Sequence, residues 1–283
     1  MRTPRHLIGV LLAVFGLLVA VALTTAAAGT NGSEASSGRA VLTGQPWDLV
    51  YISDSSGWGV ARLYAQHIRQ DRGVTVRVHD QWTAGLPALA ILERLRTPGD
   101  IWARLVRNAE VIVVYGNAAG LGIKTVERGD CSCRATIGCK APIALGPQTW
   151  RPYVVTLKAI YKRIFELRNG KPAILRTANW YVPMISHAPD SMFWAHRSWE
   201  EAGIVDACTR QEESHSAAIA RAAAAYRAPM ADVYTAFNGR DHREDPFAKG
   251  YLQADGIHPS DGGRAVIAQT LADLGYTQVK PPR

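Results

Sequence analysis

Residues 48–59 read DLVYISDSSGWG and join a short apolar run to a turn rich in Ser and Gly. The run at 48–52 has the composition of a buried strand, and a helical pattern follows at 60–70. Further strands are expected at 74–78, 111–114, 173–175 and 230–233, and further helices at 86–96, 150–168, 209–226 and 261–274. This alternation predicts an α/β fold, a three-layer doubly wound parallel sheet with helices on both faces.

Three long stretches interrupt the alternation, at 118–148, 179–206 and 237–254. They follow strands or precede the last helix, so they should gather at the carboxyl end of the sheet. Open α/β folds bind their ligands at that edge. Loops of this length in a compact domain are usually functional or tied down.

The composition is that of an ordinary globular protein. The chain has 283 residues, of which 47% are hydrophobic and 20% charged, and this excludes a disordered or fibrous protein. The net charge is +8, but no run of like charges forms a basic tail, so nucleic acid is not an expected partner.

The N-terminus has the pattern of an export signal. Arg2 and Arg5 precede an uncharged apolar stretch at 7–29, which contains three Ala at 26–28. We expect a signal peptide over 1–28, a flexible linker over 29–44 and a single domain over 45–283, placed in a secreted or extracytoplasmic location. An uncleaved membrane anchor is the alternative, since about 20 apolar residues can span a bilayer.

Cysteine usage agrees with export. Cys131, Cys133 and Cys139 lie close together, whereas Cys208 is far along the chain. We expect two disulfides, one from Cys131 or Cys133 to Cys139 and the other from the remaining Cys to Cys208. A zinc site is the alternative, but such sites usually contain a second Cys or His pair, which is missing here.

The turn after the first strand and the segment before the last helix together contain the groups for nucleophilic catalysis. Ser55 lies in the turn, and Asp255 and His258 lie three residues apart just ahead of Pro259. A serine hydroxyl needs a base, and a carboxylate on the other ring nitrogen orients that base. The alternative for the serines of the turn is that they only cap the following helix.

These two segments resemble the SGNH, or GDSL, hydrolase family. That family has its nucleophile in a Gly-Asp-Ser-Leu block and its acid and base in an Asp-x-x-His-Pro block. Residues 53–56 read SDSS, which keeps Asp54 and Ser55 but replaces the flanking Gly and Leu, and residues 255–259 match the second block. The resemblance implies a flavodoxin-like fold and a triad of Ser55, His258 and Asp255.

Two further segments match the blocks from which this family builds its oxyanion hole. Gly85, in the loop after the second strand, corresponds to a Gly whose amide is a donor. Residues 115–118 read YGNA, which keeps the donor Asn117 of a Gly-x-Asn-Asp block but loses its Gly and Asp. The resemblance implies an oxyanion hole made of the Ser55 amide, the Gly85 amide and Asn117.

The resemblance implies an exported serine esterase that hydrolyses carboxylic esters without a metal or organic cofactor. The ester is expected to be a small molecule, a polysaccharide ester or a lipid ester, and the protein a monomer, membrane-bound only if residues 1–28 stay attached. The alternative is a noncatalytic or carbohydrate-binding module, in which loop aromatics stack on sugar rings. The candidates are Trp150, Trp180, Tyr181, Phe193, Trp194, Trp199 and Tyr251.

Two other sites are considered for the turn itself. Gly57 and Gly59, with Asp80 downstream, partly match a dinucleotide fingerprint, but Arg62 occupies the place of the third Gly, where close helix packing needs a small residue. The elbow of an α/β-hydrolase, Gly-x-Ser-x-Gly, fails because Ser53 stands at its first Gly.

Overall fold

The structure is a computed structural model that describes residues 44–116, 150–183, 215–242 and 244–282. All of these belong to one compact unit, Leu42–Arg283. The predicted signal segment, Asn117 and the four Cys lie outside the described residues. Within the described part, no helix has both the length and the apolar composition needed to cross a membrane.

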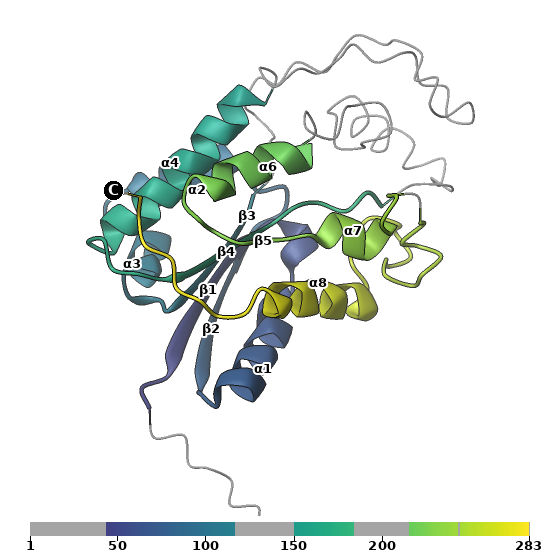
Figure 1. The fold of residues 1–283 in the computed structure, drawn as a ribbon, viewed down its shortest axis with the longest axis horizontal. Coiled ribbons are helices and arrows are strands. Elements are labelled where there is room, and N and C mark those ends of the chain that lie inside the picture. Colours follow the sequence, from purple (N-terminus) through teal and green to yellow (C-terminus); the bar gives the residue numbers. More distant parts are fainter. Residues whose placement is uncertain (1–43, 117–149, 184–214, 243, 283) are drawn as a thin grey trace, which may run out of the picture. The chain divides into compact units, whose positions relative to one another are not determined.

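The centre of the fold is a five-stranded parallel sheet in the order β2-β1-β3-β4-β5 (Figure 1). From β1 the strand order proceeds outward in both directions, to β2 on one side and to β3 on the other. This is the point at which open α/β sheets place their ligands. The strands are β1 (Trp47–Ser53), β2 (Val76–Trp82), β3 (Val111–Tyr115), β4 (Ile174–Ala178) and β5 (Met230–Ala231).

Helices cover both faces of the sheet. α1 and α8 lie together on one face, and α2, α3, α4 and α6 lie on the other (Figure 1). The predicted three-layer doubly wound α/β fold is therefore confirmed. The helices are η1 (Ser55–Gly57), α1 (Val60–Arg72), α2 (Ala88–Arg96), α3 (Ile101–Asn108), α4 (Arg151–Leu167), α6 (His215–Ala224), α7 (Val233–Asn238) and α8 (Asp261–Asp273).

The inner strands explain why their sequences are continuous apolar runs. Residues 49–52 of β1 and 111–114 of β3 are fully buried, because each strand is covered by helices on both faces. A strand in this position has no polar face, so its sequence does not alternate. These buried runs were recognisable in the sequence for that reason.

Several predicted boundaries were wrong, and two of them have an identifiable local reason. β2 is an edge strand that extends to Trp82, beyond the expected end at 78, and its polar residues 79–81 are only partly buried. β4 extends to Ala178 rather than 175. The last strand ends at Ala231, because Asp232 caps α7 by accepting a hydrogen bond from the Thr235 amide. The short helix α3 was not predicted.

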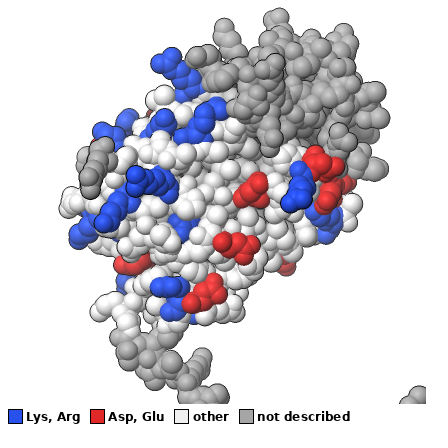
Figure 2. Space-filling model, viewed as in Figure 1, with Lys and Arg blue, Asp and Glu red and all other residues white. Residues whose placement is uncertain are grey.

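Surface charge is distributed unevenly around the sheet. On the face drawn in Figure 2, Lys and Arg gather on the side of α3 and α4, whereas most Asp and Glu lie toward α7 and α8. The α4 sequence agrees with this, since RPYVVTLKAIYKRIFEL contains four basic residues and one acidic residue. On this face, the excess of positive charge therefore lies toward α3 and α4.

A histidine is buried among aromatic rings on the helical face that contains α4 and α6. His215 is 1% exposed, stacks on Tyr153 with ring centroids 5.0 Å apart, and lies 5.0 Å from the Trp150 ring. Neither ring nitrogen has a hydrogen-bond partner among the described residues. Burial lowers the pKa of His215 to about 3, because a cation in this environment would have no compensating partner.

This histidine should make the fold sensitive to acid. The unfolded chain takes up a proton on His215 below pH about 6.5, whereas the folded chain does not until pH about 3, so unfolding becomes more favourable as the pH falls. The contribution is about 1.4 kcal/mol per pH unit between pH about 6 and 4. His215→Phe should reduce the slope of unfolding free energy against pH by that amount, as measured by urea unfolding.

The matched control is Val155→Ala, which changes an exposed residue of α4 that has no titratable group. It should leave the slope unchanged. An equal slope in wild type and in His215→Phe would show that His215 does not cause the acid sensitivity.

Candidate active site

The turn after β1 presents one serine and buries another. Asp54 caps η1 by accepting hydrogen bonds from the Ser56 amide at 3.0 Å and the Ser56 hydroxyl at 2.5 Å. Asp54 and Ser56 are almost fully buried, while Ser55 is partly exposed. The capping group of this turn is therefore a carboxylate rather than the Ser55 hydroxyl.

The glycine after these serines allows the turn to lie against β1. A Cβ on Gly57 would overlap the Ser53 side chain and approach the Tyr51 ring. Asp80 has a local partner as well, since burial raises its pKa and a hydrogen bond from the Gly59 amide partly opposes this rise. Gly57 and Asp80, two members of the partial dinucleotide fingerprint, thus have structural roles without a nucleotide.

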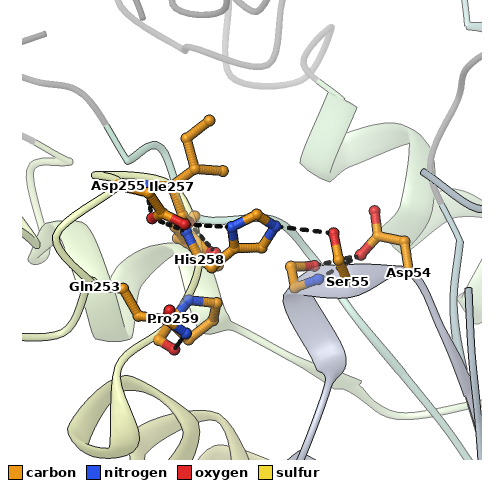
Figure 3. Close-up of polar contacts among 9 residues, drawn as sticks. Asp54, Ser55, Gln253, Asp255, Ile257, His258 and Pro259 are labelled. Carbon is orange, nitrogen blue, oxygen red and sulfur yellow. Dashed lines mark hydrogen bonds and ion pairs between the residues drawn. The ribbon is translucent and has the colours of Figure 1, made fainter. Parts of the chain in front are cut away.

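The segment before α8 folds around the side chain of Asp255. One carboxylate oxygen accepts hydrogen bonds from the amides of Ile257 at 2.9 Å and His258 at 3.0 Å, and the other lies 2.6 Å from His258 Nδ1 (Figure 3). Partial burial raises the pKa of Asp255, but these hydrogen bonds together outweigh it and hold the pKa below its usual value. The carboxylate is therefore ionised at neutral pH.

The two segments meet through the histidine. The His258 ring lies between Asp255 and Ser55, with Nε2 3.1 Å from Ser55 Oγ (Figure 3). The side chains of His258 and Asp255 are 39% and 44% exposed, so a solute can reach them. The three predicted triad residues thus form a continuous hydrogen-bonded chain, which is the geometry that lets an imidazole take a proton from a serine.

Backbone and side-chain contacts hold the histidine segment in place. Leu252 and Pro259 form an antiparallel bridge, and the Gln253 amide donates to the His258 carbonyl at 2.8 Å. The buried Tyr181 hydroxyl donates to the Ile257 carbonyl at 2.7 Å. These contacts fix the backbone on both sides of His258. The position of the His258 ring relative to Ser55 therefore does not depend on the hydrogen bonds of the ring alone.

The first turn of α8 packs tightly against this bridge. A Cβ on Gly263 would overlap the Tyr251 carbonyl oxygen, whereas a Cβ on its neighbour Gly262 would lie 3.6 Å from the nearest atoms, an ordinary contact. The two glycines therefore have different reasons to be present. Only Gly263 is required by the close approach of two backbone segments.

We expect Gly263→Ala to lower the free energy of unfolding by about 1–3 kcal/mol, because the added methyl group must push the 251–260 segment away from α8. Gly262→Ala is the matched control and should stay within about 0.5 kcal/mol of wild type. Urea unfolding of both variants checks this. Equal effects of the two substitutions would contradict the packing argument.

The predicted oxyanion donors are placed only in part. Gly85 lies in the exposed connection between β2 and α2, where the Thr83 amide donates to the Ser53 carbonyl at 3.0 Å. This hydrogen bond holds the start of the connection against the end of β1. Asn117 lies just outside the described residues, one position after Gly116, whose carbonyl accepts from Tyr153 Oη at 2.6 Å.

The loop aromatics proposed as sugar platforms are packing residues wherever the structure describes them. Trp150, Trp180 and Tyr181 are at most 7% exposed, so they cannot stack on a sugar from solvent. Tyr251 is partly buried against the Phe237 ring, and Phe193, Trp194 and Trp199 lie outside the described residues.

Two other tryptophans are exposed instead. Trp58 and Trp82 are 48% and 44% exposed. Their positions directly after the serine turn and at the end of the second strand were the signals that could have identified them.

The described residues contain no cluster of potential metal ligands. Among the described residues, no group of three or more His, Cys, Asp or Glu side chains could hold a metal ion. The four Cys, for which a zinc site was the alternative to disulfides, lie outside these residues.

Comparison with known proteins gives matches in structure but not in sequence. No protein-family model matches the chain, and no curated protein matches it. A lipase from a goat rumen metagenome superposes with a TM-score of 0.50 and 18% identity, over 81% of this chain and 98% of that one. A lipase/acylhydrolase from Enterococcus faecalis gives a TM-score of 0.50 and 15% identity, over 84% and 99%. The chain has the fold of these lipases.

The fold that the sequence resemblance implied is confirmed by these two matches. An acetylxylan esterase from Geobacillus stearothermophilus also matches, with a TM-score of 0.47 and 15% identity, over 82% of this chain and 95% of that one. At these identities the shared property is the architecture, so the chemistry must be argued from the residues of this chain.

Proposed function

We propose that this protein is a serine esterase that hydrolyses carboxylic esters. The observation that carries the proposal is the hydrogen-bonded chain from Asp255 through His258 to Ser55. These three residues meet at the carboxyl end of β1, the strand that lies between β2 and β3. Folds of this class bind their ligands there. The lipase and lipase/acylhydrolase names of two proteins with the same fold support ester hydrolysis as the class of reaction.

Ser55 is the proposed nucleophile. Its Oγ attacks the ester carbonyl while His258 Nε2, 3.1 Å away, accepts the hydroxyl proton. The imidazolium returns that proton to the departing alcohol, which leaves an acyl group on Ser55. Water then attacks the acyl group with His258 again acting as the base, and this step releases the carboxylic acid and restores the serine.

Asp255 is proposed to orient the base. Its carboxylate, 2.6 Å from Nδ1, keeps the proton of neutral His258 on that nitrogen, so that Nε2 is free to accept. The hydrogen bonds that lower the pKa of Asp255 keep it charged and able to stabilise the imidazolium.

The negative charge on the substrate oxygen needs separate donors. We propose the amides of Ser55 and Gly85 and the side chain of Asn117 for this role, by the resemblance to SGNH hydrolases. Side chains and backbone amides perform every step of this scheme, so it requires no metal or organic cofactor. We also propose that residues 1–28 direct export and that the four Cys form two disulfides in the exported, monomeric protein.

Replacement of Ser55 is the direct test of the proposal. Ser55→Ala should lower kcat for p-nitrophenyl acetate by about 10³-fold or more, because the acyl group has no acceptor. Ser56→Ala is the matched control, since its hydroxyl is already bound to Asp54, and it should keep activity within about tenfold of wild type. Circular dichroism and urea unfolding should show both variants folded.

Activity that survives in folded Ser55→Ala would reject the assignment of the nucleophile. A folded wild-type protein that is inactive on nitrophenyl esters, acetylated polysaccharides and phospholipids would reject the esterase itself.

Asn117 can be tested in the same assay. Asn117→Ala should reduce kcat by about 10²- to 10³-fold with little change in KM, because an oxyanion donor acts mainly on the transition state. Steady-state kinetics with p-nitrophenyl acetate separate the two constants. A variant within threefold of wild type would show that Asn117 is not the donor.

A further inference from the structure

Two exposed tryptophans form a small aromatic surface. Trp58 and Trp82 are 48% and 44% exposed, and their ring centroids lie 6.2 Å apart with the ring planes at 59°. Large hydrophobic side chains this exposed contribute little to the core. Leaving two indoles together in water therefore calls for an explanation.

This surface is attached directly to the nucleophile turn. The Trp58 amide donates a hydrogen bond to the Ser55 carbonyl at 3.3 Å, and Trp82 is the register partner of Ser53 across the β1–β2 pair. Trp58 follows Ser55 by three residues, so their Cα atoms are at most about 11 Å apart. A substrate that reacts at Ser55 and extends a few ångströms beyond it can reach these rings.

Charged groups border the aromatic surface. The guanidinium carbon of Arg264, on α8, lies 4.7 Å from the Trp58 ring centroid, and Arg264 Nη1 is 2.6 Å from Asp261. Arg264 is only 14% exposed, whereas the Asp261 side chain is 99% exposed. Trp58 is thus held from one side by a fixed cation, and a carboxylate able to accept hydrogen bonds is open to water beside it.

We propose that Trp58 and Trp82 form a sugar-binding subsite, and that the ester cleaved at Ser55 joins an acyl group to a hydroxyl of a carbohydrate. This rests on the proposed esterase function. A pyranose ring has an apolar C–H face, which packs on an indole, and a rim of hydroxyls, which hydrogen-bond to charged groups. The neighbourhood of two indoles and the Arg264–Asp261 ion pair provides both kinds of partner.

The same features disfavour a lipid chain as the occupant. An acyl chain or a membrane surface would need contiguous aliphatic area, and the exposed Asp261 carboxylate at its border would lose hydration on contact with it. The two indoles are instead edged by the Arg264 guanidinium and the Asp261 carboxylate, which suit the hydroxyl rim of a sugar ring better than a lipid chain.

The test compares one small and several polymeric esters. For each variant, kcat/KM is measured on p-nitrophenyl acetate and on acetylated xylan, mannan and pectin. Trp82→Ala should lower the ratio of polysaccharide to nitrophenyl kcat/KM by tenfold or more for at least one polymer, mainly through KM. Trp82→Phe should restore most of that ratio because it retains a flat ring.

Val155→Ala is the matched control, since Val155 is 57% exposed on α4 and lies on the opposite face of the sheet from α1 and α8. It should leave the ratio unchanged. Binding is measured separately by affinity electrophoresis in the same polymers, using Ser55→Ala with and without Trp82→Ala. Retardation of Ser55→Ala that disappears in the double variant supports the subsite whether or not the wild-type protein is an esterase.

Three results would overturn the proposal. The first is an unchanged ratio in Trp82→Ala together with unchanged retardation. The second is an equal loss on all substrates, which would make Trp82 a structural support for the turn. The third is a loss confined to long-chain nitrophenyl esters or phosphatidylcholine vesicles, which would assign the surface to lipid.

The esterase function and the sugar subsite can fail separately. An inactive wild-type protein whose retardation still depends on Trp82 would reject the esterase and keep the sugar subsite.

Discussion

The hydrogen bond between His258 Nε2 and Ser55 Oγ joins two turns that are 203 residues apart in the chain. Each turn depends on a different part of the fold. The serine turn is fixed to the end of the buried strand β1, and the histidine segment is fixed between α8 and a two-residue bridge. The parallel sheet brings the turns together, because it directs the carboxyl end of every strand to the same edge. A shift of either element would separate the base from the nucleophile.

In both turns a side-chain carboxylate binds backbone amides of its own segment. The Asp54 carboxylate binds the amide of Ser56, and the Asp255 carboxylate binds two amides of its own segment. In each case a carboxylate organises the loop and leaves a neighbouring side chain free to face the other turn. Gly57 and Gly263 then permit the close packing that brings each turn against its support. The polar groups that form the site are therefore also part of the local architecture.

Burial decides which aromatic residues can serve a ligand. Tyr181 donates to the Ile257 carbonyl from a buried position and stacks on Phe237 with centroids 4.4 Å apart, so it braces the histidine segment. Trp58 follows the nucleophile turn and Trp82 ends the edge strand β2, and both rings are about half exposed. Composition alone does not distinguish these two groups, because the same side chains suit a core and a binding surface.

The sequence by itself indicated a parallel sheet covered on both faces, and its resemblance to a known family named Ser55, His258 and Asp255 as candidates. Buried parallel strands are continuous apolar runs, and the Asp-x-x-His spacing is local, so both can be read along the chain. Only the tertiary structure decided where β2 ends, that Asp232 begins a helix, and which tryptophans reach solvent. These features depend on contacts between segments far apart in sequence: an edge strand has one neighbour instead of two, and exposure of an indole is set by what packs against it.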